Sequence, residues 1–224
     1  MMQFAPERNA TIIVVDDDPG VRASLDSLFR SLDLCVATYS DPSEFLAADL
    51  PSSDCCLVLD VHLKATDGLE FQTSLAQSGI DIPIIIITGH GDIPMTVRGM
   101  KAGAVDFLAK PFTDEAILHA IRNALEVSRH LRQIAQERAE IEQRYERLSA
   151  REREVMALVA SGLMNKQIAG RLELSLITVK IHRASAMKKM QAESLAEFVR
   201  IAEFLGIRDE SITRYHRSGS GTLS

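Results

Sequence analysis

The chain has 224 residues, of which 46% are apolar, and its formal net charge is −6. This length suits one large domain or two modest ones, each with its own hydrophobic core. No apolar run approaches the roughly 20 residues that cross a bilayer, and the N-terminus lacks the basic and then apolar pattern of a secretory signal. The three cysteines lie in strand-like apolar runs, which suits buried, reduced thiols. Together these features exclude a membrane protein and predict a cytoplasmic one.

The charge is distributed unevenly along the chain. Residues 1–124 contain 18 acidic and 8 basic side chains, whereas residues 149–224 contain 8 acidic and 12 basic ones. The stretch between them is balanced, with five of each sign. An acidic front and a basic back predict two parts with separate tasks.

The first part alternates short apolar runs with amphipathic ones. The pattern predicts strands at 11–15, 34–37, 55–59, 83–87 and 105–108, and helices at 19–31, 41–48, 67–78, 93–102 and from 113 onward. Runs such as 83–87 are apolar on both faces, which favours parallel strands covered by helices on each side. Residues 9–125 are therefore predicted to form an α/β doubly wound domain with a five-stranded parallel sheet of the flavodoxin-like type.

Polar residues follow four of the predicted strands. Asp16 and Asp17 end the first strand, Asp60 the third and Thr88 the fourth, and Lys110 follows the fifth. Because ligands of such sheets bind beyond the carboxyl ends of the strands, these side chains are expected to converge. Carboxylates suit Mg²⁺, whereas a lysine and a threonine suit phosphoryl oxygens.

One carboxylate of this set can itself be a nucleophile and form an aspartyl-phosphate. Asp60 is the candidate because it stands alone on the middle strand, while Asp16 and Asp17 form a pair. The alternative is that strand-end aspartates only cap the helices that follow. Asp18, directly before Pro19, fits that alternative and is predicted to be a helix N-cap.

The acidic pair, the central aspartate, Thr88 and the Lys110-Pro111 step resemble the receiver domain of two-component response regulators, and residues 87–112 resemble the FixJ-type branch. The resemblance implies that a sensor histidine kinase phosphorylates Asp60. It implies that Asp17, Asp60 and the backbone carbonyl of His62 bind Mg²⁺, with Asp16 acting through water. It also implies that Thr88 and Lys110 hold the phosphoryl group. Phe107 would be the aromatic switch residue.

The loop after Asp60 departs from the family pattern. Where the family usually has Met-Pro-Gly-Met-Asp-Gly, residues 63–68 read Leu-Lys-Ala-Thr-Asp-Gly. Because the proline is missing, the sequence does not predict how long the phosphate persists. The predicted phosphorylation chemistry is unaffected. The side chain of His62 could be an imidazole ligand, although solvent exposure is favoured.

The basic end is helical throughout. Gly162 and the Leu174-Ser175 step interrupt the pattern, Ser175 is a predicted N-cap, and the spacing is that of a helix-turn-helix. A basic helix is often only a solvated face, but here apolar residues recur at the spacing of a core. The excess of basic side chains around the third helix predicts contacts with DNA phosphates.

Residues 148–207 resemble the LuxR/NarL-type DNA-binding domain through three motifs: Leu148-Ser149-x-Arg151-Glu152-x-Glu154-Val155, Gly162-x-x-Asn165-Lys166-x-Ile168-Ala169 and Ser175-x-x-Thr178-Val179-Lys180-x-His182-Arg183. The resemblance implies an all-α four-helix domain whose last helix, at about 194–205, can pair two copies. The predicted DNA-binding residues are Lys166, Thr178, Val179, Lys180, His182, Arg183 and Lys188. Residues 208–224 form a polar tail.

The stretch between the two parts contains no glycine or proline. Apolar residues follow a three-four alternation from Ile117 to Leu148, and Arg138 is the one charged residue in this series. The pattern predicts that the last receiver helix continues through a linker at 126–147 and forms a parallel coiled-coil homodimer. The alternative is a lone helix that packs on the sheet, which would leave Leu131, Ile134 and later apolar residues uncovered.

The favoured function is a phosphorylation-switched transcription factor rather than an enzyme. Its expected partners are a sensor histidine kinase, double-stranded DNA, RNA polymerase and a second copy of the chain, and its expected cofactor is Mg²⁺. One alternative is a phosphorylation-independent DNA-binding regulator with a vestigial pocket. Another is a Mg²⁺-dependent phosphatase, but such enzymes place a second aspartate two residues after the nucleophile, where this chain has His62.

Overall fold

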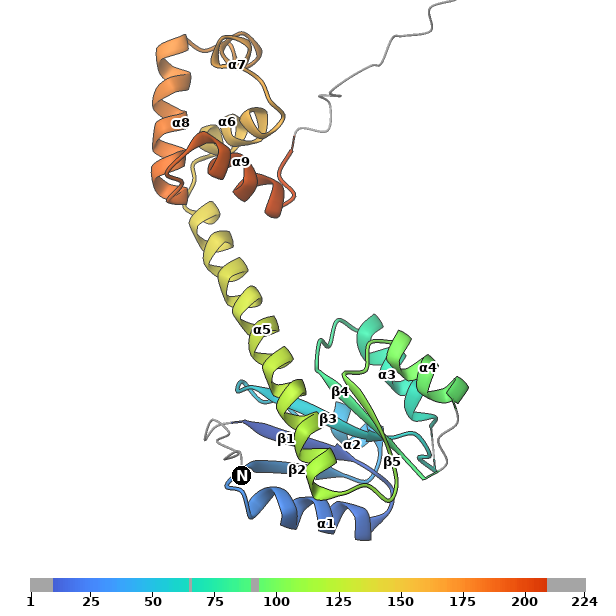
Figure 1. Cartoon of the computed structure of the whole chain (residues 1–224). Coiled ribbons are helices and arrows are strands. Elements are labelled where there is room, and N and C mark those ends of the chain that lie inside the picture. Colours follow the sequence, from blue (N-terminus) through green and yellow to red (C-terminus); the bar gives the residue numbers. More distant parts are fainter. Residues whose placement is uncertain (1–9, 65, 90–92, 209–224) are drawn as a thin grey trace, which may run out of the picture. The chain divides into compact units, whose positions relative to one another are not determined.

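The structure, a computed structural model, describes residues 10–64, 66–89 and 93–208 (Figure 1). The chain divides into two compact units, Met1–Ile134 and Ala135–Ser224. We call them the receiver unit and the C-terminal unit and describe each by itself.

The receiver unit alternates strands and helices as predicted. Its elements are β1 Thr11–Val15, α1 Pro19–Arg30, β2 Cys35–Tyr39, α2 Pro42–Leu46, β3 Cys55–Asp60, α3 Gly68–Gln77, β4 Ile84–Thr88, α4 Ile93–Lys101, β5 Asp106–Ala109 and the beginning of α5 Asp114–Glu146. All neighbouring strands pair in parallel, in the order β2-β1-β3-β4-β5. The predicted flavodoxin-like fold is confirmed.

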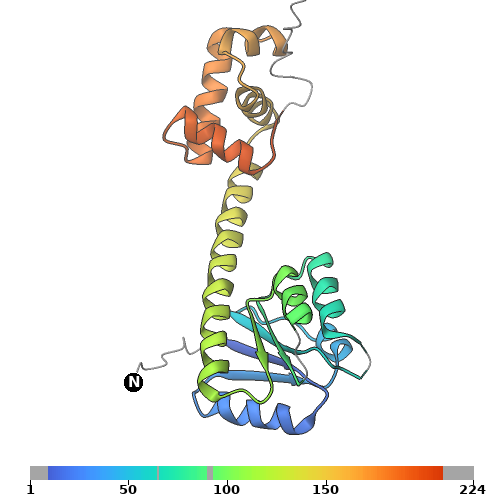
Figure 2. The same ribbon diagram turned by 45° about the vertical axis from the view of Figure 1, so that its right-hand side comes forward.

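Helices cover both faces of the sheet (Figures 1 and 2). On one face α1 and α5 contribute Phe29 and Ile121 to a core cluster; on the other, α2 and α3 contribute Phe45 and Leu75 to a second cluster. The central strands are buried on both faces, which explains their continuous apolar sequence. The expectation that all three cysteines are buried is confirmed only for Cys56, since Cys55 is partly exposed and Cys35, on the edge strand β2, is exposed.

The first turns of α5 belong to the receiver core. Ile117, Ala120 and Ala124 are fully buried there, so these three residues of the predicted coiled-coil series cannot contact a second chain. Further along the helix, Ser128 Oγ accepts a hydrogen bond from the backbone N–H of Cys55, at 3.1 Å. Arg132 donates to Asp54 at 3.1 Å, so α5 is attached to the start of β3.

The last turns of α5 pack in the C-terminal unit. Ile141 and Tyr145 lie against its core, so they are covered as well. The series from Ile117 to Leu148 is therefore not one continuous exposed seam. Its exposed apolar side chains are Val127, Leu131 and Ile134, which are 40%, 37% and 42% exposed.

The C-terminal unit contains four further helices within residues 135–208: α6 Ala150–Ala160, α7 Asn165–Leu172, α8 Leu176–Met190 and α9 Leu195–Phe204. They surround a core that includes Val155, Ile168 and Phe198. The side chain of Ser175 accepts a hydrogen bond from the backbone N–H of Thr178, which confirms the predicted cap of α8. No helix in the part of the chain that the structure describes is long and apolar enough to span a membrane.

Candidate functional site

Three carboxylates meet at the carboxyl ends of β1 and β3. These strands are neighbours and Val15 pairs with Leu59, so Asp16 and Asp60 follow at the same edge. Asp16 is fully buried and Asp60 nearly so, whereas Asp17 is partly exposed. Ligand oxygens of the three side chains lie within 4.8 Å of one another. An all-oxygen set of this size fits the ligand preference of Mg²⁺.

Lys110 extends into the carboxylate cluster from the loop after β5. Its Nζ donates to Asp16 Oδ2 at 2.7 Å and to Asp60 Oδ2 at 3.0 Å. Burial favours the neutral amine, but the two hydrogen bonds outweigh burial and raise the pKa of Lys110. For Asp16, burial disfavours the charged carboxylate and raises its pKa. The hydrogen bond from Lys110 acts in the opposite direction but does not outweigh burial. A cation is thus held directly against the predicted nucleophile.

Thr88 and Phe107 connect this edge to the neighbouring strands. Thr88 is fully buried at the end of β4, and its carbonyl accepts from the backbone N–H of Lys110 at 2.7 Å. Phe107 is partly buried on β5, and a Cβ added at Gly99 of α4 would lie 3.6 Å from its ring. The predicted switch residues therefore occupy adjacent strands, with Phe107 against α4.

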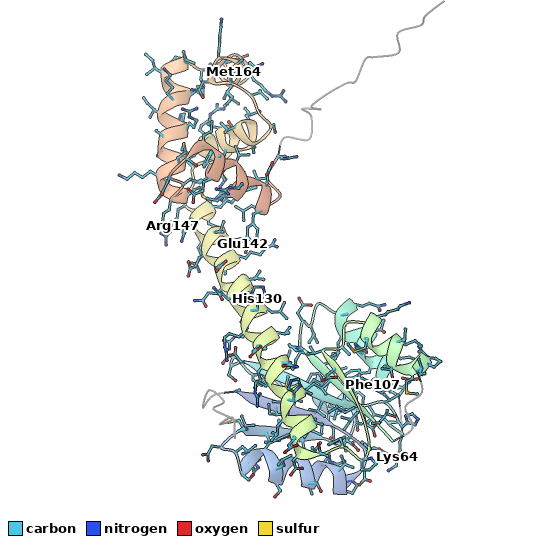
Figure 3. All side chains as sticks on the ribbon, viewed as in Figure 1. Lys64, Phe107, His130, Glu142, Arg147 and Met164 are labelled. Atoms are coloured by element: carbon cyan, nitrogen blue, oxygen red, sulfur yellow. The ribbon has the colours of Figure 1, made fainter. Side chains whose placement is uncertain are left out.

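The loop between β3 and α3 forms another wall. His62 is exposed, as expected for its side chain, and its backbone N–H donates to Asp60 Oδ1 at 3.4 Å. Asp67 caps α3 by accepting from the backbone N–H of Leu69. Lys64, labelled in Figure 3, places its Nζ 3.3 Å from Asp17 Oδ2. The sequence spacing of Asp17 and Lys64 did not predict this ion pair.

Helix α1 completes the surroundings. Asp18 accepts from the backbone N–H groups of Gly20 and Val21, which confirms its predicted capping role. Arg22 donates to the carbonyl of Asp16 at 2.6 Å. Between α1 and the β5–α5 loop lies a cleft of about 660 Å³, lined by Asp18, Gly20, Val21, Ser24, Leu25, Leu28, Lys110, Pro111, Phe112 and Asp114. The carboxylate cluster therefore borders a largely apolar hollow.

The predicted DNA-binding residues lie on α7 and α8 of the C-terminal unit. Lys166, Lys180 and Lys188 are exposed. His182 and Arg183 are half-buried, and Arg183 donates to Asn165 Oδ1 at 3.2 Å, which joins α8 to α7. The half-buried Thr178 lies at the start of α8, and its hydroxyl is 2.8 Å from that of Ser175.

The assignment of Val179 to the DNA-binding set is wrong. Its side chain is fully buried and packs in the core of the C-terminal unit, on the side of α8 that faces this core. The sequence interpretation did not single out Ile177 and Ile181 of α8, which the structure shows to be exposed isoleucines close to Lys180 in the sequence. Their spacing of four residues, out of phase with the core residue Val179, was the available signal.

Glu152 fastens α8 to α6. It is buried and accepts hydrogen bonds from Ser185 Oγ at 2.6 Å and Lys189 Nζ at 2.7 Å. It also accepts from the backbone N–H of Ser149, as part of a capping box. Burial raises the pKa of Glu152, but these hydrogen bonds outweigh it and lower the pKa to about 2. Lys189 therefore joins α8 to α6 although its side chain is 40% exposed.

Comparison with known families divides the chain as the geometry does. Residues 12–122 match the response regulator receiver domain. Residues 146–202 match the bacterial regulatory proteins of the luxR family. The first match contains the carboxylate cluster, and the second contains α6, α7 and α8 with most of α9.

Relatives match over nearly the whole chain. Nodulation protein W of Bradyrhizobium diazoefficiens is 52% identical over 88% of this chain and 87% of its own length. The solved structure of response regulator StyR is 44% identical, with a TM-score of 0.72 over 88% of this chain and 99% of its own. Full-length FixJ from B. japonicum is 39% identical, with a TM-score of 0.52 over 89% of this chain and 98% of its own. The chain therefore belongs to the FixJ-type two-component response regulators, transcription factors that join a receiver domain to a LuxR-type DNA-binding domain.

Proposed function

We propose that phosphorylation of Asp60 by a sensor histidine kinase switches DNA binding by the C-terminal unit. One observation carries this proposal: Asp60 lies nearly buried beside Asp16 and Asp17, with Lys110 Nζ at 3.0 Å. A buried carboxylate with a cation and further oxygen ligands around it is the arrangement that an acyl phosphate needs.

The transfer is a displacement at phosphorus. A carboxylate oxygen of Asp60 attacks, the P–O bond forms, and the bond between phosphorus and the kinase histidine nitrogen breaks. Lys110 then exchanges its hydrogen bond to Asp60 for one to a phosphoryl oxygen, while its contact with Asp16 keeps it in place. The hydroxyl of Thr88 is our second phosphoryl donor. We assign no enzymatic turnover of other substrates.

Asp16, Asp17, Asp60 and the backbone carbonyl of His62 are the groups that we expect to hold Mg²⁺, with Asp16 acting through water. Bound Mg²⁺ supplies positive charge that offsets the charge of the phosphoryl oxygens. The support is the all-oxygen donor set within 4.8 Å. Asp16 and Asp17 come from one loop, so they are held together before any ion binds.

The cleft between α1 and the β5–α5 loop is our candidate docking surface for the kinase. It is lined by apolar side chains such as Leu28 and Phe112 and includes Lys110, which contacts Asp60. A helix of the kinase that rests there would bring its phosphohistidine close to the acceptor. Burial of these apolar side chains would stabilise the complex without requiring a particular charge on the kinase surface.

The switch would run through Thr88 and Phe107. A phosphoryl group that recruits the hydroxyl of Thr88 changes the packing at the end of β4, and β5 lies directly beside β4. Phe107 lies on β5 so close to α4 that a Cβ added at Gly99 would be 3.6 Å from its ring. We therefore expect the surface formed by α4 and β5 to change between the two states.

DNA binding would use α8 as the recognition helix. Lys166, Lys180 and Lys188 are the exposed basic side chains that we expect at phosphates or base edges. Thr178, His182 and Arg183 complete the predicted set, with Arg183 also joining the two helices. A LuxR-type match and a net positive charge support this use.

RNA polymerase remains a predicted partner, supported by the transcription factors to which the chain is related. A homodimer through α5 also remains a prediction, now limited to the exposed residues Val127, Leu131 and Ile134. We place the protein in the cytoplasm, where its kinase and DNA partners would meet it.

Incubation with Mg²⁺ and acetyl phosphate, followed by intact-mass measurement, tests the acceptor. Wild-type protein should gain one phosphoryl group and Asp60→Asn should gain none. Asp26→Asn, a change at a partly exposed α1 carboxylate paired with Arg30, is the matched control and should be labelled like wild type. Full labelling of Asp60→Asn would refute the assignment.

A further inference from the structure

Lys64 lies beside the metal-binding carboxylates but outside the phosphoryl-binding set. It stands on the loop after β3 (Figure 3), and its Nζ is 3.3 Å from Asp17 Oδ2. Its side chain is 83% exposed, so it reaches this carboxylate from solvent. The sequence pattern of the family leads us to expect an uncharged proline at this position.

The two lysines of the pocket are held very differently. Lys110 is only 20% exposed and is anchored by two carboxylates, Asp16 and Asp60. Lys64 contacts only Asp17 among the carboxylates of the described residues, and Asp17 is the most exposed member of the three-carboxylate set. The contact of Lys64 can therefore open and close without disturbing the core of the receiver unit.

We propose that Lys64 is a tethered cation that competes with Mg²⁺ for Asp17 and thereby lowers the affinity of the pocket for the ion. This inference rests on the proposed function, because it takes Asp17 as a Mg²⁺ ligand. An ion at Asp17 draws on the same carboxylate charge as the ammonium group, so ion binding weakens or displaces the contact of Lys64. The positive charge of Lys64 also opposes a second cation a few ångströms away.

The proposal predicts both the size of the change in Mg²⁺ affinity and the chemical group that causes it. An exposed ion pair is weak, so the removal of Lys64 should tighten Mg²⁺ binding by about two- to fivefold rather than by orders of magnitude. The effect requires a positive charge at this position, because a neutral side chain does not repel the ion. It should persist with arginine, which keeps the charge at the same place.

Isothermal titration calorimetry with MgCl₂ on the full chain at fixed ionic strength tests the proposal. The variants are Lys64→Gln, Lys64→Arg and the matched control Lys101→Gln, an exposed lysine at the end of α4. Lys64→Gln should bind Mg²⁺ about two- to fivefold more tightly than wild type, whereas Lys64→Arg and Lys101→Gln should bind it like wild type.

Equal affinities of wild type and Lys64→Gln would overturn the proposal, and so would an equal gain in Lys101→Gln, which would indicate a general charge effect. Asp17→Asn separates these results from a failure of the proposed function. If Asp17→Asn binds Mg²⁺ as tightly as wild type, or if wild type binds none, the magnesium assignment fails and the role of Lys64 fails with it. A strong loss in Asp17→Asn without any gain in Lys64→Gln refutes the role of Lys64 alone.

Discussion

Gly68, the first residue of α3, lies directly against the backbone of Asp60. A Cβ at position 68 would be 2.2 Å from the carbonyl oxygen of Asp60 and 2.8 Å from the Cα of Val61. The backbone N–H of Gly68 also donates to the carbonyl of Val61 at 2.9 Å. This contact holds the loop after β3 against the end of the strand that carries Asp60.

Gly68→Ala should therefore destabilise the receiver unit and displace Asp60. Neither clashing atom belongs to a flexible side chain, so the backbone must move, and we expect a loss of about 1–3 kcal/mol in the free energy of unfolding. Urea denaturation measures this loss, and acetyl phosphate labelling should slow. Gly170→Ala is the control, because a Cβ there meets no atom within 4 Å. Unchanged stability of Gly68→Ala would contradict this geometry.

Glu152 should make the stability of the C-terminal unit depend on acid pH. Its folded-state pKa of about 2 lies below the ordinary value of 4.5. Its contribution is therefore complete above about pH 4.5 and is lost as the pH falls toward 2. Because the Lys189 side chain is 40% exposed, solvent screening limits the contribution to about 1 kcal/mol.

Glu152→Gln tests this pH dependence. Urea denaturation followed by helical circular dichroism should show the variant destabilised at pH 7, with the difference from wild type shrinking by pH 3. Glu154→Gln is the matched control, since Glu154 makes an exposed ion pair with Arg151 on the same helix. A difference from wild type that stays constant between pH 7 and pH 3 would show that the ionised carboxylate is not the cause.

Lys180→Ala should weaken DNA binding through the loss of a phosphate contact. We expect the slope of log K against log salt concentration to fall by about one unit. Fluorescence anisotropy with a labelled promoter fragment measures the slope at several salt concentrations. Lys101→Ala, in the receiver unit, should leave it unchanged. If Lys180→Ala retains the wild-type slope, α8 does not carry the contact predicted for it.

Ile134→Glu should abolish any self-association that depends on α5. The exposed residues Val127, Leu131 and Ile134 cover only about two turns, less than the three to four heptads of a sustained coiled coil, so the dimer should be weak. Sedimentation velocity at tens of micromolar compares wild type with Ile134→Glu. A dimer that is indifferent to this glutamate would place the interface elsewhere.

Most of the receiver fold could be predicted because its strands are buried on both faces. A continuous apolar run such as 84–88 has few alternatives, and the polar residue that ends it marks the carboxyl edge of the sheet. The convergence of Asp16, Asp60 and Lys110 followed from that edge alone. The ion pair between Lys64 and Asp17 did not follow, because the reach of a long side chain has no sequence period.

The errors arose where one period fits two environments. Ile117 and Ala124 have the spacing of a coiled coil, but the same stripe packs on the sheet. Ile141 and Tyr145 continue the stripe, yet they cover the core of another unit. Val179 lies inside a DNA-binding motif and is nevertheless a core residue. Periodicity identifies an apolar face, but it does not show which partner covers each part of that face.

The most direct test of the central claim is the DNA affinity of the full chain with and without acetyl phosphate, measured by fluorescence anisotropy on a bound promoter fragment in the presence of Mg²⁺. The phosphodonor should change the affinity of wild type severalfold and leave that of Asp60→Asn unchanged. Asp26→Asn should respond like wild type. An equal response of wild type and Asp60→Asn, or no response of wild type once intact-mass measurement shows it phosphorylated, would contradict a switch at Asp60.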